Sequence, residues 1–179
     1  MINIITPCSR PLNLLRIAGS INIPADQYRW MVVFDGDTRP NVNLPNNAEY
    51  YEHKDALSTF GNSQRNFALD LIDNGLVYFN DDDTIIHPDL WDNIKDKTDH
   101  DFISFAQAHK NGSLRLSGKN IEVGHIDSHN FIVDHSICKN IRFPIDRYDA
   151  DGYFAVDCYR QAKNSIYIPM VLSIYNQLR

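Results

Sequence analysis

Three consecutive aspartates, Asp81, Asp82 and Asp83, are the residues with the clearest potential for chemistry in this sequence. Adjacent carboxylates repel one another, and a loop tolerates them best when a hard divalent cation binds their oxygens. The alternative is a solvated acidic turn whose charge lies near the N-terminus of the next helix. The triplet follows a buried apolar run over residues 76–79 almost directly, and this position favours a binding site.

Two further polar residues follow or precede apolar segments in the same half of the chain. Asp35 comes directly after the apolar run 30–34, where its carboxylate could accept hydrogen bonds from a base or a ribose, although Asp-Gly is also a common turn dipeptide. Arg65 lies in the first turn of an expected helix, whose positive end suits a phosphate or the acidic loop. An ordinary surface arginine is the alternative for Arg65.

In the second half of the chain, His125, Asp127 and His129 alternate, so that one face of a strand could present all three. A zinc site is disfavoured because no fourth ligand stands nearby, and we interpret Asp127 as a carboxylate that binds hydroxyl groups. Asp149 and Asp151 precede an expected helix. Either one could cap that helix, or act as a general base if the helix start faces a cleft.

The elements that must position these residues follow from the apolar pattern. We expect strands over 2–6, 30–34, 50–51, 76–79, 102–106, 114–116, 131–133 and 166–168. We expect helices over 11–21, 62–72, from 88 onward and over 151–162. Strands that alternate with helices indicate a mixed α/β fold with a mostly parallel sheet, in which ligands bind at the carboxyl ends of the strands.

The same pattern gives local details that a structure can test. Pro7 should end the first strand, and Leu12, Leu15 and Ala18 should form the buried face of the first helix, with Ser9 as its cap. The pair Asn62-Ser63 should cap the next helix, and Gly75 should end it.

Length and composition limit the possible functions. With 179 residues, 43% of them hydrophobic, the chain can bury one sizeable core, so we expect a single domain. The net charge of -6 argues against nucleic acid as a partner. Three cysteines without paired spacing and the lack of a long apolar segment predict a cytoplasmic protein without a membrane span.

Taken together, the motifs INIITPCSRP, WMVVFDGD and SQRNFALDLIDNGLVYFNDDDTIIHPDLW resemble the nucleotide-binding half of GT-A fold glycosyltransferases. In motif order the chain is most similar to the inverting glucuronyltransferase-type family. The resemblance covers residues 2–91 and continues more loosely through GHIDSHNFIV and DADGYFAVD. It implies a GT-A-like, Rossmann-related sheet flanked by helices, with a nucleotide-binding half over residues 1–91 and an acceptor and catalytic half over residues 92–179.

The resemblance also implies roles for single residues. Donor contacts would come from Pro7, Asp35, Arg65, Asp81 and Asp82, and Asp83 on a solvent-facing loop would ligate Mn²⁺ or Mg²⁺. Asp127 would bind sugar hydroxyls, and Asp151 would be the base, with Asp149 as its rival. The chain lacks the family's stacking aromatic near Cys8 and its C-terminal Trp-His pair, which leaves Tyr175 or Arg179 to contact the pyrophosphate.

The predicted activity is the transfer of a sugar from a nucleotide-diphosphate sugar, a UDP-sugar, to a glycan or other hydroxyl acceptor with inversion. Because the chain is short for this fold, another chain could supply acceptor contacts. A nucleotidyltransferase is one alternative, disfavoured because residues 7–10 are not glycine-rich. A non-catalytic module that binds nucleotide sugars is the other alternative.

Overall fold

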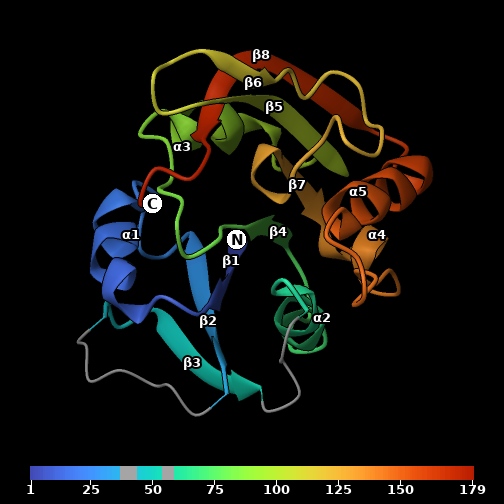
Figure 1. Ribbon diagram of the computed structural model, residues 1–179. Helices are drawn as coiled ribbons and strands as arrows, with labels where there is room; N and C mark the ends of the chain where they lie inside the picture. Colours follow the sequence, from blue (N-terminus) through green and yellow to red (C-terminus); the bar gives the residue numbers. More distant parts are fainter. Residues whose placement is uncertain (37–43, 54–58) are drawn as a thin grey trace.

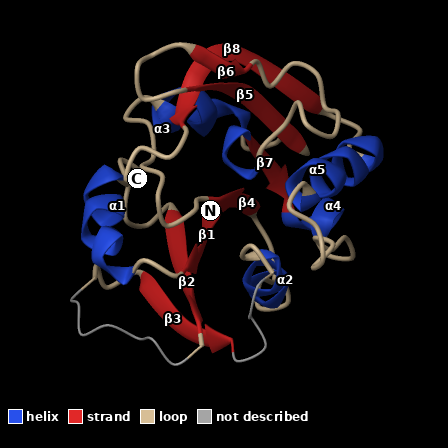
Figure 2. Ribbon diagram, viewed as in Figure 1, coloured by secondary structure: helices blue, strands red, loops and turns tan. Residues whose placement is uncertain are grey.

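The computed structural model describes residues 1–36, 44–53 and 59–179, and within these ranges the chain forms three layers with a sheet between two layers of helices (Figure 1). Figure 2 shows the same arrangement by secondary structure, with helices on both sides of the strands. A mixed α/β fold is thus confirmed, and its parallel strand pairs lie mainly in the first half of the chain.

The sheet has the strand order β3-β2-β1-β4-β7-β5-β6, and β8 pairs with β5 outside this path. Its strands are β1 (Ile2–Cys8), β2 (Tyr28–Asp35), β3 (Ala48–His53), β4 (Leu76–Phe79), β5 (Phe102–Ala108), β6 (Leu114–Leu116), β7 (Phe131–Asp134) and β8 (Ser165–Ile174). The pairs among β1, β2, β3 and β4 are parallel. Strand β7 is antiparallel to β4, so the start of β7 lies at the same sheet edge as the carboxyl end of β4.

The α-helices are α1 (Leu14–Ser20), α2 (Asn62–Leu69), α3 (Leu90–Ile94), α4 (His135–Cys138) and α5 (Ala150–Gln161). Short 3₁₀ turns are η1 (Pro11–Asn13), η2 (Lys95–Lys97) and η3 (Ser128–Asn130). The expected helix from residue 88 onward begins at Leu90, because Pro88 belongs to the preceding turn.

Alternating strand residues enter two hydrophobic cores, one on each face of the sheet. Ile4 and Tyr78 pack with residues of α1 and α3, whereas their neighbours Ile5 and Phe79 pack with residues of α2, α4 and α5. Strands covered on both faces have continuous apolar sequences, which explains why these runs were recognisable.

The first helix buries a different face from the one expected. Leu14 and Ile17 are its buried residues, whereas Leu12 and Leu15 are 86% and 55% exposed. Leu14 and Ile17 have the same spacing of three residues as Leu12 and Leu15, so the spacing alone does not decide which face packs against the sheet. Ser9 does not cap this segment, because its amide and hydroxyl bind Asp82 instead.

Three other local predictions are wrong in detail. Strand β1 continues through Pro7 to Cys8. Helix α2 has Gly61 at its N-cap and ends at Leu69, so Asn62 is helical and donates to the carbonyls of Pro144 and Arg147. Gly75 lies in the turn before β4 with φ of 96°, where a Cβ atom would lie 2.7 Å from the Met1 carbonyl oxygen.

In the described ranges, no helix has the length and apolar character needed to cross a bilayer. The three cysteines are free thiols in the interior, and burial raises the pKa of Cys8 to about 12. Their inert, protonated state agrees with a packing role.

Candidate active site

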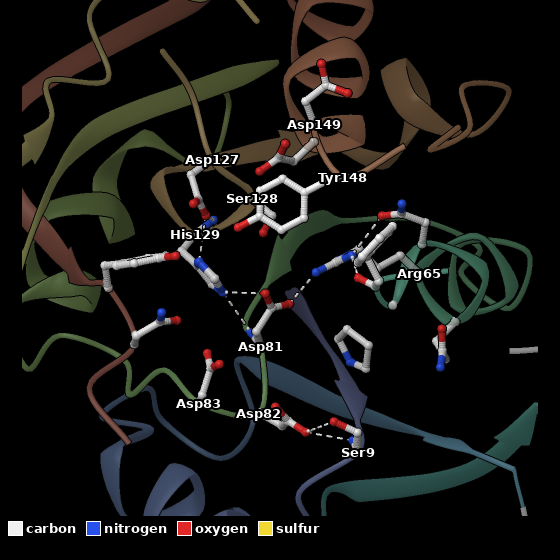
Figure 3. A pocket seen from close by; sticks show the side chains of 18 of the residues that line it. Ser9, Arg65, Asp81, Asp82, Asp83, Asp127, Ser128, His129, Tyr148 and Asp149 are labelled. Carbon is white, nitrogen blue, oxygen red and sulfur yellow. Dashed lines mark hydrogen bonds and ion pairs between the residues drawn. The ribbon is translucent and has the colours of Figure 1, made fainter. Parts of the chain in front are cut away.

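A cavity of about 520 Å³ opens at the carboxyl ends of β1, β2 and β4. All the residues for which the sequence predicted a role line it, namely Pro7, Asp35, Arg65, Asp81, Asp82, Asp83, Asp127, Asp149 and Asp151. They come from segments that are up to 144 positions apart, counted from Pro7 to Asp151. The fold therefore gathers the predicted residues into one site (Figure 3).

Asp82 joins the acidic loop to the end of β1. Its Oδ2 atom accepts hydrogen bonds from the amides of Ser9 and Arg10, both at 2.6 Å, and from the Ser9 hydroxyl at 3.0 Å. The Arg10 guanidinium contacts its Oδ1 atom. Because both oxygens of Asp82 are engaged with this chain, its main effect in this structure is to position the loop.

Asp83 is buried, with 2% of its surface exposed, so the expectation of a solvent-facing carboxylate is wrong. Its Oδ2 atom lies 2.6 Å from Nε of Arg179 and 3.2 Å from the Arg10 guanidinium. The C-terminal segment folds over the loop, since the Leu178 amide also donates to the Asp83 carbonyl at 2.7 Å. Two cationic side chains thus already surround the carboxylate predicted to ligate metal.

Arg65 is buried rather than a surface arginine, and it connects α2 to the acidic loop. Its guanidinium donates to the Phe60 carbonyl and to Oδ1 of Asn62, and it forms an ion pair with Asp81. Burial opposes ionisation of Asp81, but Arg65 and His129 hold the pKa of its carboxyl well below the ordinary range. Asp81 is therefore a carboxylate at neutral pH.

His129 lies between two carboxylates, as Figure 3 shows. Its Nδ1 atom is 2.7 Å from Asp127, and its Nε2 atom is 3.2 Å from Asp81. Burial opposes the charged ring, but the two carboxylates raise the pKa of His129 well above its ordinary value. Without a proton on Nε2, the ring would accept a hydrogen bond from the Asp81 amide, whose nitrogen lies 3.0 Å away. The two neighbouring carboxylates favour the protonated, cationic ring over this neutral form.

Asp127 begins the turn η3 and accepts a hydrogen bond from the His129 amide at 3.1 Å. Its second oxygen pairs with Arg115 at 2.8 Å, and the Arg115 guanidinium lies 3.8 Å from the centre of the Tyr175 ring. Burial disfavours its ionised form, yet His129 and Arg115 lower the pKa of Asp127 to about 2.

Asp151 and Asp149 differ sharply in environment. Burial, reinforced by the nearby Asp127 carboxylate, raises the pKa of Asp151 to about 6, and its Oδ1 accepts from the Gly152 amide at 2.8 Å. Asp149 is partly exposed, and its hydrogen-bonded ion pair with Arg147 lowers its pKa. Asp149 occupies the N-cap position of α5 without making a side-chain capping bond.

The remaining predicted residues frame the base of the cavity. Asp35 ends β2, next to Gly36, whose φ of 72° starts the turn. Pro7 packs against Gly61, where an added Cβ would come within 3.0 Å of the proline ring. Larger side chains at position 61 would therefore push the start of α2 away from β1.

Sequence reasoning missed several residues of the cavity. Arg115 and Tyr148 were not singled out, and Arg10 was considered only as part of a segment that is not glycine-rich. Arg115 has no local signal because it lies on the short strand β6. Tyr148 is 76% exposed and contacts Phe60 edge to face, with 5.6 Å between the ring centres. The sequence does not show that Phe60 and Tyr148 are neighbours, so it gives no reason to place these two exposed aromatic residues in the site.

No three His, Cys, Asp or Glu side chains converge into a group that could enclose a metal ion in the described part of the chain. A cation at Asp83 would therefore need most of its ligands from bound substrate and water. Carboxylate oxygen is nevertheless the donor that Mg²⁺ and Mn²⁺ prefer.

Neither a protein-family profile nor the sequence of a curated protein matches this chain. Several solved structures share its fold. S. aureus TarS (residues 1–349) in complex with UDP-GlcNAc superimposes with a TM-score of 0.74 at 18% identity, over 97% of this chain and 57% of the TarS chain. The mannosyltransferase PcManGT from Pyrobaculum calidifontis, in complex with GDP-Man and Mn²⁺, superimposes with a TM-score of 0.68 at 14% identity. The match covers 98% of this chain and 56% of the PcManGT chain. Bifunctional IspDF from Campylobacter jejuni superimposes with a TM-score of 0.59 at 14% identity, over 93% of this chain and 49% of the IspDF chain.

These similarities establish the fold as that of GT-A-type glycosyltransferases. The narrower likeness to glucuronyltransferases is not confirmed and stays a prediction. The chain spans somewhat more than half the length of the TarS and PcManGT chains that it matches.

Proposed function

We propose that this protein is a metal-dependent glycosyltransferase that moves a sugar from a nucleotide-diphosphate sugar, preferably a UDP-sugar, to an acceptor hydroxyl with inversion. The observation that carries the proposal is the placement of Asp151. Its carboxyl group, with a pKa of about 6, lines the same cavity as the acidic loop after β4. Similar folds bind UDP-GlcNAc and GDP-Man, and this supports a nucleotide sugar as the ligand.

The chemistry of such a transfer requires a base on one side of the sugar and positive charge on the other. A carboxylate with a pKa near 6 is ionised at neutral pH and still basic enough to take the proton of an attacking hydroxyl. A single in-line displacement would then invert the anomeric carbon. We assign the base to Asp151 because Asp149 is held in an exposed ion pair with Arg147.

Positive charge at the diphosphate would come from two sources. Arg10 and Arg179 already form ion pairs with Asp83. A guanidinium group can also bind two phosphate oxygens at once through parallel hydrogen bonds. A divalent cation fits at Asp83 because, among the residues that the structure describes, the Oδ1 atom of Asp83 accepts a hydrogen bond only from the Thr84 hydroxyl, at 3.3 Å. Such a cation, when bound, supplies Lewis-acid stabilisation to the leaving diphosphate.

The two parts of the chain have separate tasks in this proposal. In residues 1–91, Asp35 would contact the base, and the donor site would be formed by Pro7, Arg65, Asp81 and Asp82. Residues 92–179 would contribute Asp127, which binds the sugar, and Asp151, which deprotonates the acceptor hydroxyl.

A non-catalytic module that binds nucleotide sugars is the second candidate, since it would need the donor site and no base. The environment of Asp151 favours an enzyme, because a carboxyl group with a pKa of about 6 suits proton transfer near neutral pH, and a binding module needs no proton transfer. The nucleotidyltransferase alternative has no specific observation in its favour.

The test combines binding with turnover. Purified protein is screened by thermal unfolding against UDP-, GDP- and CDP-linked sugars with and without Mn²⁺, since a ligand of the native state raises its stability by mass action. Ligands that stabilise are then assayed for release of the nucleoside diphosphate with hydroxyl acceptors. Stabilisation together with release supports the transferase, stabilisation without any release supports the binding module, and absence of both contradicts the proposal.

A further inference from the structure

Five charged side chains form a continuous chain across the floor of the cavity. They alternate in sign in the order Arg65, Asp81, His129, Asp127 and Arg115. The first two come from α2 and the loop after β4, and the last three come from η3 and β6. His129 is thus the junction between the two parts of the chain in this network (Figure 3).

Two hydrogen bonds hold the backbone of His129, and one of them is made with Asp127 itself. The Tyr78 hydroxyl donates to the His129 carbonyl at 3.2 Å, and the His129 amide donates to Asp127 within a capping box that also includes Asn130. With its backbone fixed from both sides, the imidazole is a rigid spacer between the carboxylates of Asp81 and Asp127. Arg65 also holds Asp81 and Arg115 also holds Asp127, so the ring connects two carboxylates that are each anchored on their other side.

Stability alone does not account for this arrangement. Buried ion pairs offset their desolvation only in part, and well-packed apolar residues often stabilise a fold as well or better. Without a cation between them, however, two buried carboxylates would repel each other and either move apart or take up a proton. A cationic ring between the two carboxylates therefore keeps them ionised and close to each other.

We propose that His129 is a positioning residue that aligns the donor-binding carboxylate Asp81 with the sugar-binding carboxylate Asp127. This inference rests on the proposed function, because it assigns the two carboxylates to the same nucleotide-sugar substrate. His129 does not touch the reacting atoms in this role. It fixes the relative placement of two groups that do.

Two variants separate the two ends of the ring. In His129→Asn the amide nitrogen can replace Nδ1, which keeps the contact with Asp127 and loses that with Asp81. In His129→Gln the amide reaches the position of Nε2, which keeps the contact with Asp81 and loses that with Asp127. The exposed His125 provides the matched control His125→Asn, four residues earlier and outside the network.

The expected results differ between the variants. Loss of a hydrogen bond to a charged group corresponds to about a ten- to hundredfold change. His129→Asn should weaken the affinity for UDP, measured by calorimetry, by about this factor. His129→Gln should bind UDP within about threefold of the wild type, but its kcat for sugar transfer should fall by about ten- to hundredfold. His125→Asn should match the wild type in both measurements.

If the role of His129 were purely structural, both variants would lose UDP affinity and kcat to the same extent. Equal losses in His129→Asn and His129→Gln would therefore overturn the proposal. So would wild-type behaviour of both variants. If the wild type itself binds no UDP and transfers no sugar, the proposed function fails and this role fails with it.

A measurement on the wild type covers the case in which neither variant folds. With ¹⁵N-labelled histidine, saturation with UDP should shift the Nε2 resonance of His129, which faces Asp81, and leave the His125 ring unchanged. UDP binding without any change at His129 would overturn the role.

Discussion

Replacing Asp151 by Asn should abolish most of the activity and, at neutral pH and above, make the protein more stable. Asn keeps the size of the side chain and the acceptor for the Gly152 amide but cannot take up a proton. Loss of a positioned base lowers turnover by about 10²–10⁴. UDP binding should persist, because Asp151 is assigned to the acceptor side.

The stability change follows from the sign of the pKa shift. Burial and Asp127 raise the pKa of Asp151 from 3.8 to about 6, so the folded state binds this proton more tightly than the unfolded state. The stabilising contribution is fully present below pH 3.8 and is lost as the pH rises through about 6. The corresponding free energy is at most about 3 kcal/mol, since one pKa unit corresponds to about 1.4 kcal/mol.

The assay is urea unfolding of wild type and Asp151→Asn from about pH 4 to pH 8, together with the pH profile of kcat/KM. We expect equal stability at the acid end and a variant that gains up to about 3 kcal/mol above pH 7. Wild-type kcat/KM should fall about tenfold per pH unit below about pH 6, as the base of the free enzyme becomes protonated. An Asn variant that is less stable at pH 8, or one with wild-type turnover, would refute this reasoning. Loss of turnover in Asp149→Asn alone would transfer the role to Asp149.

Three other predictions test the site and the fold. Asp83→Asn should remove the dependence of UDP affinity on Mn²⁺, and unchanged metal-dependent affinity by calorimetry would contradict a cation at this residue. Wild-type protein should bind UDP more tightly than GDP or CDP, whereas equal affinity would mean that Asp35 does not read the base. Leu14→Ala should lower the free energy of unfolding by about 2–5 kcal/mol, because Leu14 is fully buried. Leu12→Ala should change it by less than about 0.5 kcal/mol, and a reversed order in urea unfolding would restore the helix face expected from the sequence.

The positions of most strands, and of the polar residues that follow them, were predictable from the amino-acid pattern. Runs such as Val77 to Phe79 are apolar on both faces because helices cover the sheet on both sides, so they are visible without knowledge of the partner strands. Asp35 and Asp81 are close to the ends of such runs in the sequence. Parallel strands bring their carboxyl ends to one edge, which is why these residues could be placed in one site before the structure was known.

The contacts of the acidic side chains, in contrast, follow from tertiary packing. The alternation of His125, Asp127 and His129 permitted a metal site, but the antiparallel pairing of β7 with β4 places His129 between Asp127 and Asp81 instead. Burial of Asp83 depends on Arg179, which is 96 residues away. Such contacts arise from the meeting of distant segments at a sheet edge, and no local pattern of residue types encodes them. The environment of each carboxylate, and with it the difference in pKa between Asp149 and Asp151, is therefore a property of the fold.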